Sequence, residues 1–236
     1  MNDPDRGYRT FDHDVHARSM APDDYWGQIR RTVNGRPVSE EQIRMIVDAV
    51  RSGLDLQGAD ALLDLAGGNG ALSARLFDSC SSFLGVDSSE YLVSVANEHF
   101  RKLPDYRFAL ADVADYAANE PDPGVFTRVL CYGSFSYFPA ESAATLLRLL
   151  DERFVRVERL FIGNLPDKKR LSGFYVSSPP APGELEDPRS QIGIWRSQKE
   201  FRALAEQCGW NTEFRLMPAA FYASHYRYDA ILTRPA

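Results

Sequence analysis

Residues 62–70 read Leu-Leu-Asp-Leu-Ala-Gly-Gly-Asn-Gly, an apolar run that carries one acid and ends in a cluster of glycines. The apolar run predicts a buried strand, and a helical pattern follows the glycines. Glycines at such a junction let the backbone turn sharply and let a ligand approach it closely. The helix that follows presents backbone N–H groups that have no intrahelical partner. This stretch therefore predicts a strand, a loop and a helix that together can hold a ligand.

Short apolar runs alternate with helical patterns through the centre of the chain. Strands that alternate with helices of this length form a parallel sheet with right-handed crossovers. We therefore predict an α/β fold with a Rossmann-like, doubly wound and mostly parallel sheet. The expected strands are Ala61–Ala66, Ser82–Val86, Tyr106–Ala109, Val125–Cys131 and Arg159–Gly163, and the expected helices span 70–79, 89–101 and 141–152.

The N-terminal part of the chain differs from this alternating centre. Residues 1–38 are polar and turn-rich, with three prolines and several aromatic side chains. Ser39 then begins a helix as the first residue of a capping box whose partner is Gln42, and Gly53 is expected to end that helix. This segment predicts an N-terminal helical lid over the sheet.

The C-terminal part predicts one more helix and two paired strands. A second capping box, at residues 197–200, begins a helix. The extended runs 213–217 and 226–232 are joined by a turn that is too short for a crossover helix, so we expect them to pair antiparallel and to supply the last strand of the sheet. The proline-rich segment 171–189 predicts a long loop before this helix.

Two further acids mark the ends of predicted strands. Asp87 ends the second apolar run, and Asp112 follows the third. A carboxylate at the end of the second strand is placed to accept hydrogen bonds from both hydroxyls of a ribose. Because the carboxyl ends of parallel strands share one edge of a sheet, we expect Asp64, Asp87 and Asp112 to converge on one crevice.

The glycine cluster and these acids resemble the first motifs of the class I S-adenosylmethionine-dependent methyltransferases. In that family an apolar strand and an acid precede Gly-x-Gly-x-Gly, and here Ala66 stands at the first glycine position, before Gly68 and Gly70. A methyl group is tolerated there if the local backbone dihedrals are negative. The resemblance covers about 62–163 and the helix and strands that follow, and the flanking segments are similar to a subgroup of small bacterial methyltransferases.

The resemblance implies S-adenosyl-L-methionine as the cofactor and assigns roles to individual residues. Asp87 would bind the ribose, and Asp112 with Val113 would meet the adenine edge. Asp64 would help to position the amino group of the cofactor. Tyr25 and Trp26, in the lid, would either close over the cofactor or pack the lid against the core. The whole expected cofactor-binding set is Asp64, Ala66, Gly68, Gly70, Asp87, Ser88, Asp112, Val113, Tyr132, Tyr25 and Trp26.

Two residues are candidates for a catalytic base. His225 lies among tyrosines at the start of the last strand, and a histidine with a near-neutral pKa suits the deprotonation of a hydroxyl or an amine. Asp167, just past the fifth strand, is the competing candidate, and for both residues a role without catalysis is an equal alternative. The expected substrate-contacting residues are Tyr137, Tyr175, Tyr222 and Tyr226.

Composition narrows the class of protein. The 236 residues carry a formal net charge of −6, which argues against an affinity that rests on nucleic-acid phosphates. No apolar run approaches the roughly 20 residues of a membrane-spanning helix, and the charged N-terminus does not resemble a secretory signal. The three cysteines, Cys80, Cys131 and Cys208, are widely spaced and predict neither disulfides nor a metal site, so a cytoplasmic location is expected.

We therefore expect one methyltransferase domain that modifies a hydroxyl or an amine of a small molecule without a metal. A saccharide or natural-product intermediate is the favoured acceptor, and no nucleic-acid or membrane partner is expected. The alternatives are a nicotinamide-dependent oxidoreductase and a non-catalytic cofactor-binding or partner protein on the same fold. The expected parts are an N-terminal lid (1–58), a cofactor-binding core (59–165), a substrate loop (166–195) and a C-terminal helix with antiparallel strands (196–236).

Overall fold

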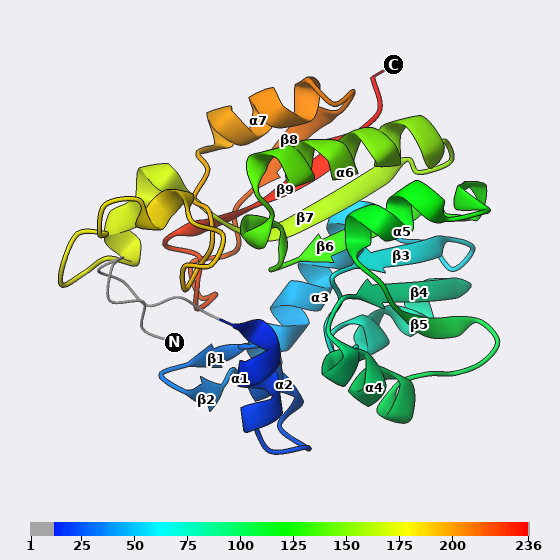
Figure 1. The fold of residues 1–236 in the computed structure, drawn as a ribbon, viewed down its shortest axis with the longest axis horizontal. Coiled ribbons are helices and arrows are strands. Elements are labelled where there is room, and N and C mark those ends of the chain that lie inside the picture. Colours follow the sequence, from blue (N-terminus) through cyan, green and yellow to red (C-terminus); the bar gives the residue numbers. More distant parts are fainter. Residues whose placement is uncertain (1–11, 236) are drawn as a thin grey trace.

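The computed structural model describes residues 12–235, whose centre is a seven-stranded sheet with helices on both faces (Figure 1). The strand order is β5-β4-β3-β6-β7-β9-β8, and only β9 runs antiparallel to its neighbours. The predicted Rossmann-like sheet with an antiparallel last strand is therefore confirmed. The strands are β3 (Ala61–Leu65), β4 (Ser82–Asp87), β5 (Tyr106–Leu110), β6 (Arg128–Tyr132), β7 (Arg159–Pro166), β8 (Asn211–Arg215) and β9 (Arg227–Thr233).

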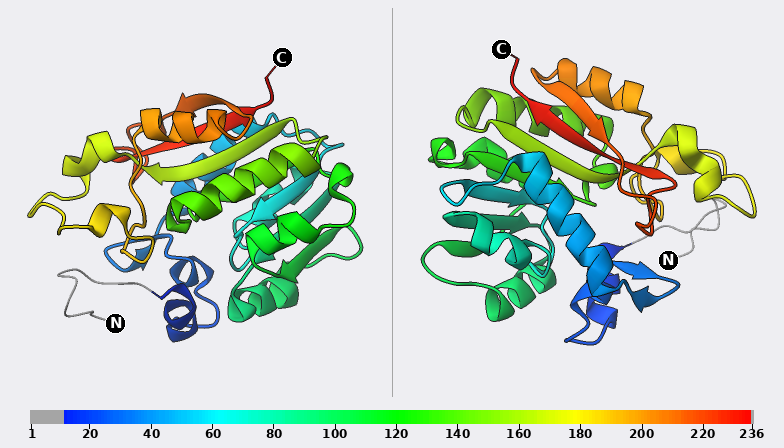
Figure 2. Two further views of the ribbon diagram at one scale, coloured as in Figure 1. Left: turned by 45° about the horizontal axis from the view of Figure 1, so that its top comes forward. Right: turned by 180° about the vertical axis from the view of Figure 1, so that it is seen from behind.

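Two apolar clusters fix the helices to the two faces of the sheet (Figure 2). One cluster joins α3 and the 3-10 helix η1 to the first face, and the other joins α5, α6 and α7 to the opposite face. No helix within residues 12–235 has the length and apolar character needed to cross a membrane. The elements are α3 (Glu40–Leu54), η1 (Ser73–Ser79), α4 (Glu90–His99), α5 (Val113–Asn119), α6 (Ala140–Arg153) and α7 (Gln198–Glu206).

Three local predictions were wrong or incomplete. Within the predicted helix 70–79, only residues 73–79 are helical, and they form the 3-10 helix η1 and not an α-helix. The short helix α5 was not predicted, because only Val113 and Ala117 of its seven residues are buried and so little periodicity is visible. Helix α3 continues through Gly53 and ends at Leu54, and its C-cap residue Asp55 adopts the left-handed conformation (φ 49°).

The start of α3 has a different bonding pattern from the predicted capping box. The Ser39 hydroxyl accepts a hydrogen bond from the Gln42 backbone N–H, as expected for an N-cap. The Gln42 side chain, however, donates to the Ala220 carbonyl (3.0 Å) and accepts from the Tyr222 N–H (2.9 Å). Gln42 therefore ties the N-terminal half of the chain to the segment that precedes β9. The second capping box, between Ser197 and Glu200, is confirmed.

The N-terminal segment consists of two short helices and a hairpin that lie beside the sheet (Figure 1). Helix α1 (His13–Ser19) contacts α4, and helix α2 (Tyr25–Gln28) follows it. The hairpin β1–β2 (Thr32–Val33 and Arg36–Pro37) turns through Asn34 and Gly35, both with positive φ, as a two-residue hairpin loop requires. The sequence had predicted a helical lid without this hairpin.

Candidate active site

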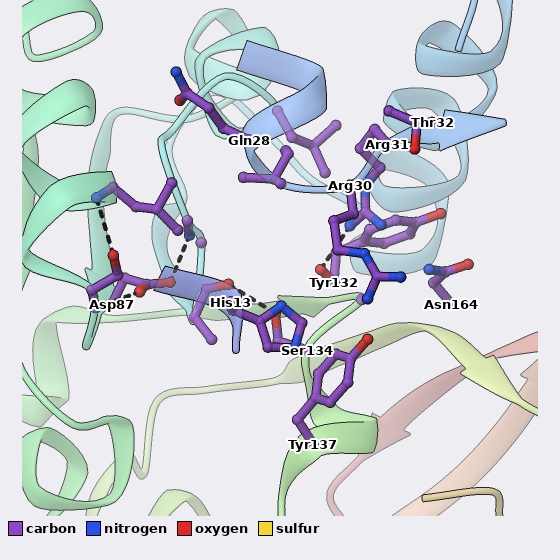
Figure 3. A pocket seen from close by; sticks show the side chains of 18 of the residues that line it. His13, Gln28, Arg30, Arg31, Thr32, Asp87, Tyr132, Ser134, Tyr137 and Asn164 are labelled. Carbon is purple, nitrogen blue, oxygen red and sulfur yellow. Dashed lines mark hydrogen bonds between the residues drawn. The ribbon is translucent and has the colours of Figure 1, made fainter. Parts of the chain in front are cut away.

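A cavity of about 820 Å³ lies at the carboxyl edge of the parallel strands, between the ends of β3, β4, β6 and β7 and the N-terminal segment (Figure 3). Asp87 lies at one side of it and Asn164 at the other, with His13 and Ser134 between them. The position agrees with the general rule that ligands of open α/β sheets bind beyond the carboxyl ends of the strands.

Asp87 anchors the glycine loop at the end of β4. Its Oδ2 accepts a hydrogen bond from the Gly68 N–H (2.8 Å), and its Oδ1 accepts one from the Ser89 N–H (2.9 Å). Burial raises the pKa of Asp87, and the backbone N–H donors oppose that rise. A carboxylate has about four lone-pair sites, so Asp87 keeps acceptor capacity toward the cavity, which it lines together with Ser88.

Asp64 lies beneath the glycine loop and is almost completely buried (3% exposed). Its Oδ2 accepts a hydrogen bond from the Ser73 hydroxyl (2.5 Å). A Cβ at Gly67 would stand 2.7 Å from the same oxygen, so only glycine fits above this acid. Burial raises the pKa of Asp64 to about 7, the Ser73 hydrogen bond lowers it, the Asp87 charge raises it and Arg31 lowers it.

We expect this burial to make stability depend on pH. The folded pKa of Asp64 (about 7) exceeds its unfolded value (3.8), so the folded protein binds more protons between these values and loses stability as the pH rises through that window. Asp229, whose pKa burial raises to about 6, adds to the effect. His13, whose pKa is lowered to about 4, acts in the opposite direction, so the test is a comparison of variants: the change in melting temperature between pH 5.5 and pH 8 should differ between the wild type and Asp64→Asn, with the variant losing less stability at the higher pH. An equal difference in both proteins would contradict this account.

Ala66 adopts a left-handed backbone conformation (φ 58°), contrary to the expectation of negative dihedrals at this position. Its N–H donates to the Val86 carbonyl (2.7 Å), and its carbonyl accepts from the Ser134 hydroxyl (3.0 Å). These contacts hold the first turn of the glycine loop between β4 and the end of β6. A residue with a Cβ is strained in this conformation by about 1–2 kcal/mol, so the loop carries backbone strain at the cavity wall.

Ala66→Gly should therefore increase the free energy of unfolding. Relief of about 1–2 kcal/mol of strain outweighs the roughly 0.4–1 kcal/mol that glycine adds to the entropy of the unfolded chain. Urea denaturation of both proteins measures the difference. Ala61→Gly, in the extended strand β3, serves as the matched control and should destabilise the protein by about 0.5–1 kcal/mol. Destabilisation of similar size at both positions would rule out strain at Ala66.

Asn69, inside the glycine motif, binds the N-terminal segment to the loop. Its side chain is fully buried, and Nδ2 donates to the Tyr25 carbonyl (2.8 Å) and to the Gln28 side-chain oxygen (2.9 Å). The Tyr25 ring packs against His99 and Phe100 at the end of α4. The N-terminal segment is therefore fixed to the glycine loop through its backbone and through a side chain.

Arg31 projects from the N-terminal segment into the cavity and is 8% exposed (Figure 3). Its guanidinium lies 4.8 Å from the centre of the Tyr132 ring and donates to the Tyr132 carbonyl (3.0 Å). A Cβ at Gly133, where φ is +80°, would stand 2.4 Å from the guanidinium. The Nε of Arg31 is buried without a hydrogen-bond partner. Arg31 thus brings a buried positive charge to the end of β6.

The far wall of the cavity is polar and aromatic. The expected substrate residues Tyr137, Tyr222 and Tyr226 all line it, together with Asn164 and Arg227. Asn164 occupies an irregularity in the β7–β9 pairing, has a positive φ (65°), and donates its N–H to Asp229 (2.7 Å). Its side-chain oxygen is buried without a hydrogen-bond partner.

Several of the expected site residues do not line the cavity. Asp112 caps α5 by accepting from the Ala114 and Asp115 N–H groups, and its side chain is exposed. Gly70 has a positive φ and packs against Phe108, which explains the glycine without a ligand. The remaining residues of this kind are Val113, Tyr25, Trp26 and Tyr175; Tyr175 packs on Trp195 behind the wall.

The two candidate bases also lie outside the cavity wall. Asp167 is buried and caps the 3-10 helix η4 (Lys168–Gly173) by accepting from the Lys169 N–H (2.9 Å). His225 is exposed, and its backbone contacts Gly173. The structure thus gives each of these residues a position that needs no catalytic role.

The cavity contains residues that the sequence analysis did not select. His13 lines it and meets the Tyr137 ring edge-on at 4.3 Å between ring centres, and Arg31, Asn164 and Arg227 line it as well. The segments that carry the two arginines had been noted for their similarity to small bacterial methyltransferases. A Gly-Asn pair inside an apolar strand, as at 163–164, is the signal of a bulge that would have pointed to Asn164.

Comparisons with known proteins agree with this geometry. Residues 62–153 match the family described as "Methyltransferase domain". An uncharacterised methyltransferase of Schizosaccharomyces pombe is 31% identical over 112 residues, which make up 44% of this chain. The aligned region spans only 38% of that yeast protein.

Solved structures show the same fold at low sequence identity. Magnesium protoporphyrin IX methyltransferase from Synechocystis PCC 6803, with bound S-adenosylmethionine, superposes with a TM-score of 0.57, 18% identity, and coverage of 95% of this chain and 98% of that one. The putative methyltransferase in complex with the Haloferax volcanii Trm112 activator superposes with a TM-score of 0.62 and 16% identity, and the match covers 84% of this chain and 91% of that one. The small RNA methyltransferase HEN1 superposes with a TM-score of 0.61 and 16% identity, and the match covers 85% of this chain and 26% of that one.

The sheet order and the methyltransferase-domain match over 62–153 confirm the resemblance to the class I S-adenosylmethionine-dependent methyltransferases that was seen in the sequence. The domain match falls on β3 to α6, the part that carries Asp64, the glycine loop and Asp87.

Proposed function

We propose that this protein transfers the methyl group of S-adenosylmethionine to a hydroxyl or an amine of a small molecule, without a metal. The observation that supports this most directly is the single cavity with two chemically different walls. One wall carries Asp64, Asp87 and the glycine loop, and the other carries tyrosines, Asn164 and Arg227. A saccharide or natural-product intermediate fits the second wall, because hydroxyl-rich molecules pair with phenol and amide groups.

The residues at the first wall fit the cofactor. The remaining acceptor capacity of Asp87 suits two ribose hydroxyls, and Ser88 lies beside it in the wall. The buried Arg31 guanidinium, whose Nε has no partner, suits a carboxylate, and Asp64 beneath the loop suits an ammonium group. When bound, the cofactor supplies an activated methyl sulfonium.

The chain's own contribution to the reaction is chiefly alignment and shielding from water. In-line displacement from an activated leaving group gains most from holding the reactants in position. The tyrosines of the far wall would orient the acceptor. Of the four histidines, only His13 lines the cavity, and we propose it as the proton acceptor.

Titration calorimetry with S-adenosylhomocysteine, with NADH as the control ligand, tests the proposal first. We expect micromolar binding of S-adenosylhomocysteine and none of NADH. Binding of NADH alone would favour a nicotinamide-dependent oxidoreductase. Binding of S-adenosylhomocysteine without methyl transfer to any of a panel of saccharides, amines and RNA would favour a non-catalytic protein on this fold, and transfer to RNA alone would replace the small-molecule acceptor.

A further inference from the structure

The guanidinium groups of Arg31, which is buried, and of Arg227, which is half-buried with a buried Nε, line the cavity, and the cofactor carboxylate can pair with only one of them. Arg31 lies next to the Tyr132 carbonyl, and its charge acts on Asp64 beneath the glycine loop, so it belongs to the cofactor side. The methionine part of S-adenosylmethionine carries one carboxylate. Arg227, at the start of β9, lines the same cavity and is left without an anion.

The contacts of Arg227 hold its guanidinium in place without neutralising it. One terminal nitrogen donates to the Asn164 carbonyl, and the group lies 4.9 Å from the centre of the Tyr226 ring. Tyr226 in turn packs against Phe174 and Trp195, with ring centres 5.2 and 6.0 Å apart. Of the four residues Asn164, Tyr226, Phe174 and Trp195, three are aromatic, and they add rigidity and no counter-charge.

No carboxylate of the described part of the chain forms a direct ion pair with this guanidinium. Arg227 takes part in none of the ion pairs found within residues 12–235. The nearby acid Asp229 accepts the Asn164 N–H; burial raises its pKa to about 6 and the Arg227 charge lowers it, but no hydrogen bond joins the Asp229 and Arg227 side chains. The Nε of Arg227 is buried without a partner. A half-buried guanidinium with an unpartnered buried nitrogen gains stability from a ligand that supplies an anion.

Two further polar atoms in the same wall have no partner. The Tyr132 hydroxyl and the Asn164 side-chain oxygen are buried and make no hydrogen bond, and their residues are 5% and 6% exposed. The acidity of the Tyr132 phenol is suppressed by burial, which raises its pKa, so this hydroxyl remains a donor. The Asn164 oxygen is an acceptor. This wall therefore offers a cation, a donor and an acceptor that its own side chains leave unused.

We infer that the methyl acceptor carries a carboxylate or phosphate group that binds Arg227, and hydroxyl groups that pair with Asn164 and Tyr132. This rests on the proposed methyltransferase function and specifies its substrate as an acidic, hydroxyl-bearing small molecule. An uncharged saccharide would leave the half-buried Arg227 charge unpaired, so the wall discriminates against it.

The test uses the full chain saturated with S-adenosylhomocysteine and four calorimetric probes: glucose 6-phosphate, glucuronate, inorganic phosphate and glucose. We expect at least one of the sugar anions to bind at least tenfold more tightly than glucose. Tighter binding of glucose 6-phosphate would indicate that the acceptor carries a phosphate group, and tighter binding of glucuronate would indicate a carboxylate. Arg227→Gln should weaken that binding at least tenfold, and Arg227→Lys should weaken it less.

Matched controls keep the outcomes distinct. Arg202→Gln, on the exposed side of α7, should leave anion binding unchanged. Unchanged S-adenosylhomocysteine affinity in Arg227→Gln shows that this variant is folded; if it fails that check, the Arg227→Lys comparison decides. Two outcomes would overturn the inference and leave the methyltransferase proposal standing. In the first, S-adenosylhomocysteine binds the wild type but neither sugar anion binds better than glucose. In the second, both Arg227 variants bind the anion as tightly as the wild type does. If S-adenosylhomocysteine does not bind, both fall.

Discussion

Asp87→Ala should weaken the binding of S-adenosylhomocysteine more than tenfold. The carboxylate has two backbone N–H donors of its own and acceptor capacity left toward the cavity. Each charge-assisted hydrogen bond to a ribose hydroxyl contributes about 1.5–3 kcal/mol, and about 1.4 kcal/mol corresponds to a factor of ten in affinity. Titration calorimetry at fixed ionic strength measures the change.

Asp112→Ala is the matched control for this experiment. Asp112 also follows a parallel strand, but it is exposed, caps α5 and does not line the cavity. We expect its substitution to leave the affinity within about twofold and to lower stability by about 1 kcal/mol, as the loss of an N-cap does. Equal losses of affinity in both variants would refute the assignment of the ribose to Asp87 alone.

Arg31→Met should weaken S-adenosylhomocysteine binding by about tenfold to a hundredfold, since it removes a charge-assisted contact worth about 1.5–3 kcal/mol. Methionine keeps much of the length of the side chain and its packing on the Tyr132 ring. The free energy of unfolding of the ligand-free protein should not fall in proportion, because replacing a buried charge with an apolar group is often neutral or stabilising. Calorimetry and urea denaturation together measure both quantities.

Arg36→Met provides the comparison, because Arg36 lies in the same N-terminal segment but is exposed on β2. It should change neither affinity nor stability beyond about 0.5 kcal/mol. A large loss of stability in Arg31→Met, with affinity unchanged, would show that Arg31 holds the segment together and does not bind the cofactor.

The cofactor side of the cavity could be predicted from sequence because its determinants are local. An apolar strand, an acid and a glycine-rich turn occupy consecutive positions, and Asp64, Gly68 and Asp87 reach the cavity simply by ending adjacent parallel strands. The conformation of Ala66 was not predictable in this way. Its positive φ is imposed by bonds to Val86 and to Ser134, which lies 68 residues away in sequence.

The acceptor side depends on contacts between distant segments that leave no periodic pattern. Gln42 has the residue type and spacing of a capping box, yet its side chain bonds across 178 residues to the segment before β9. Arg31 and Arg227 appear in the sequence as ordinary arginines, and only the fold shows that both are directed into one cavity. His225 and Asp167 had suitable chemistry, but neither borders the cavity in the folded protein.

The division of the cavity between two sets of segments has an evolutionary consequence. The wall assigned to the cofactor arises mainly from the ends of β3, β4 and β6, whereas much of the opposite wall arises from η3 (Phe135–Tyr137), the irregular end of β7 and the segments around 174, 192 and 222–227. Loops tolerate substitution and insertion better than a buried sheet does. Substitutions and insertions in those loops can therefore change the acceptor while the wall assigned to the cofactor stays the same. Chimaeras that exchange only these loops are a direct route to redesign of acceptor specificity.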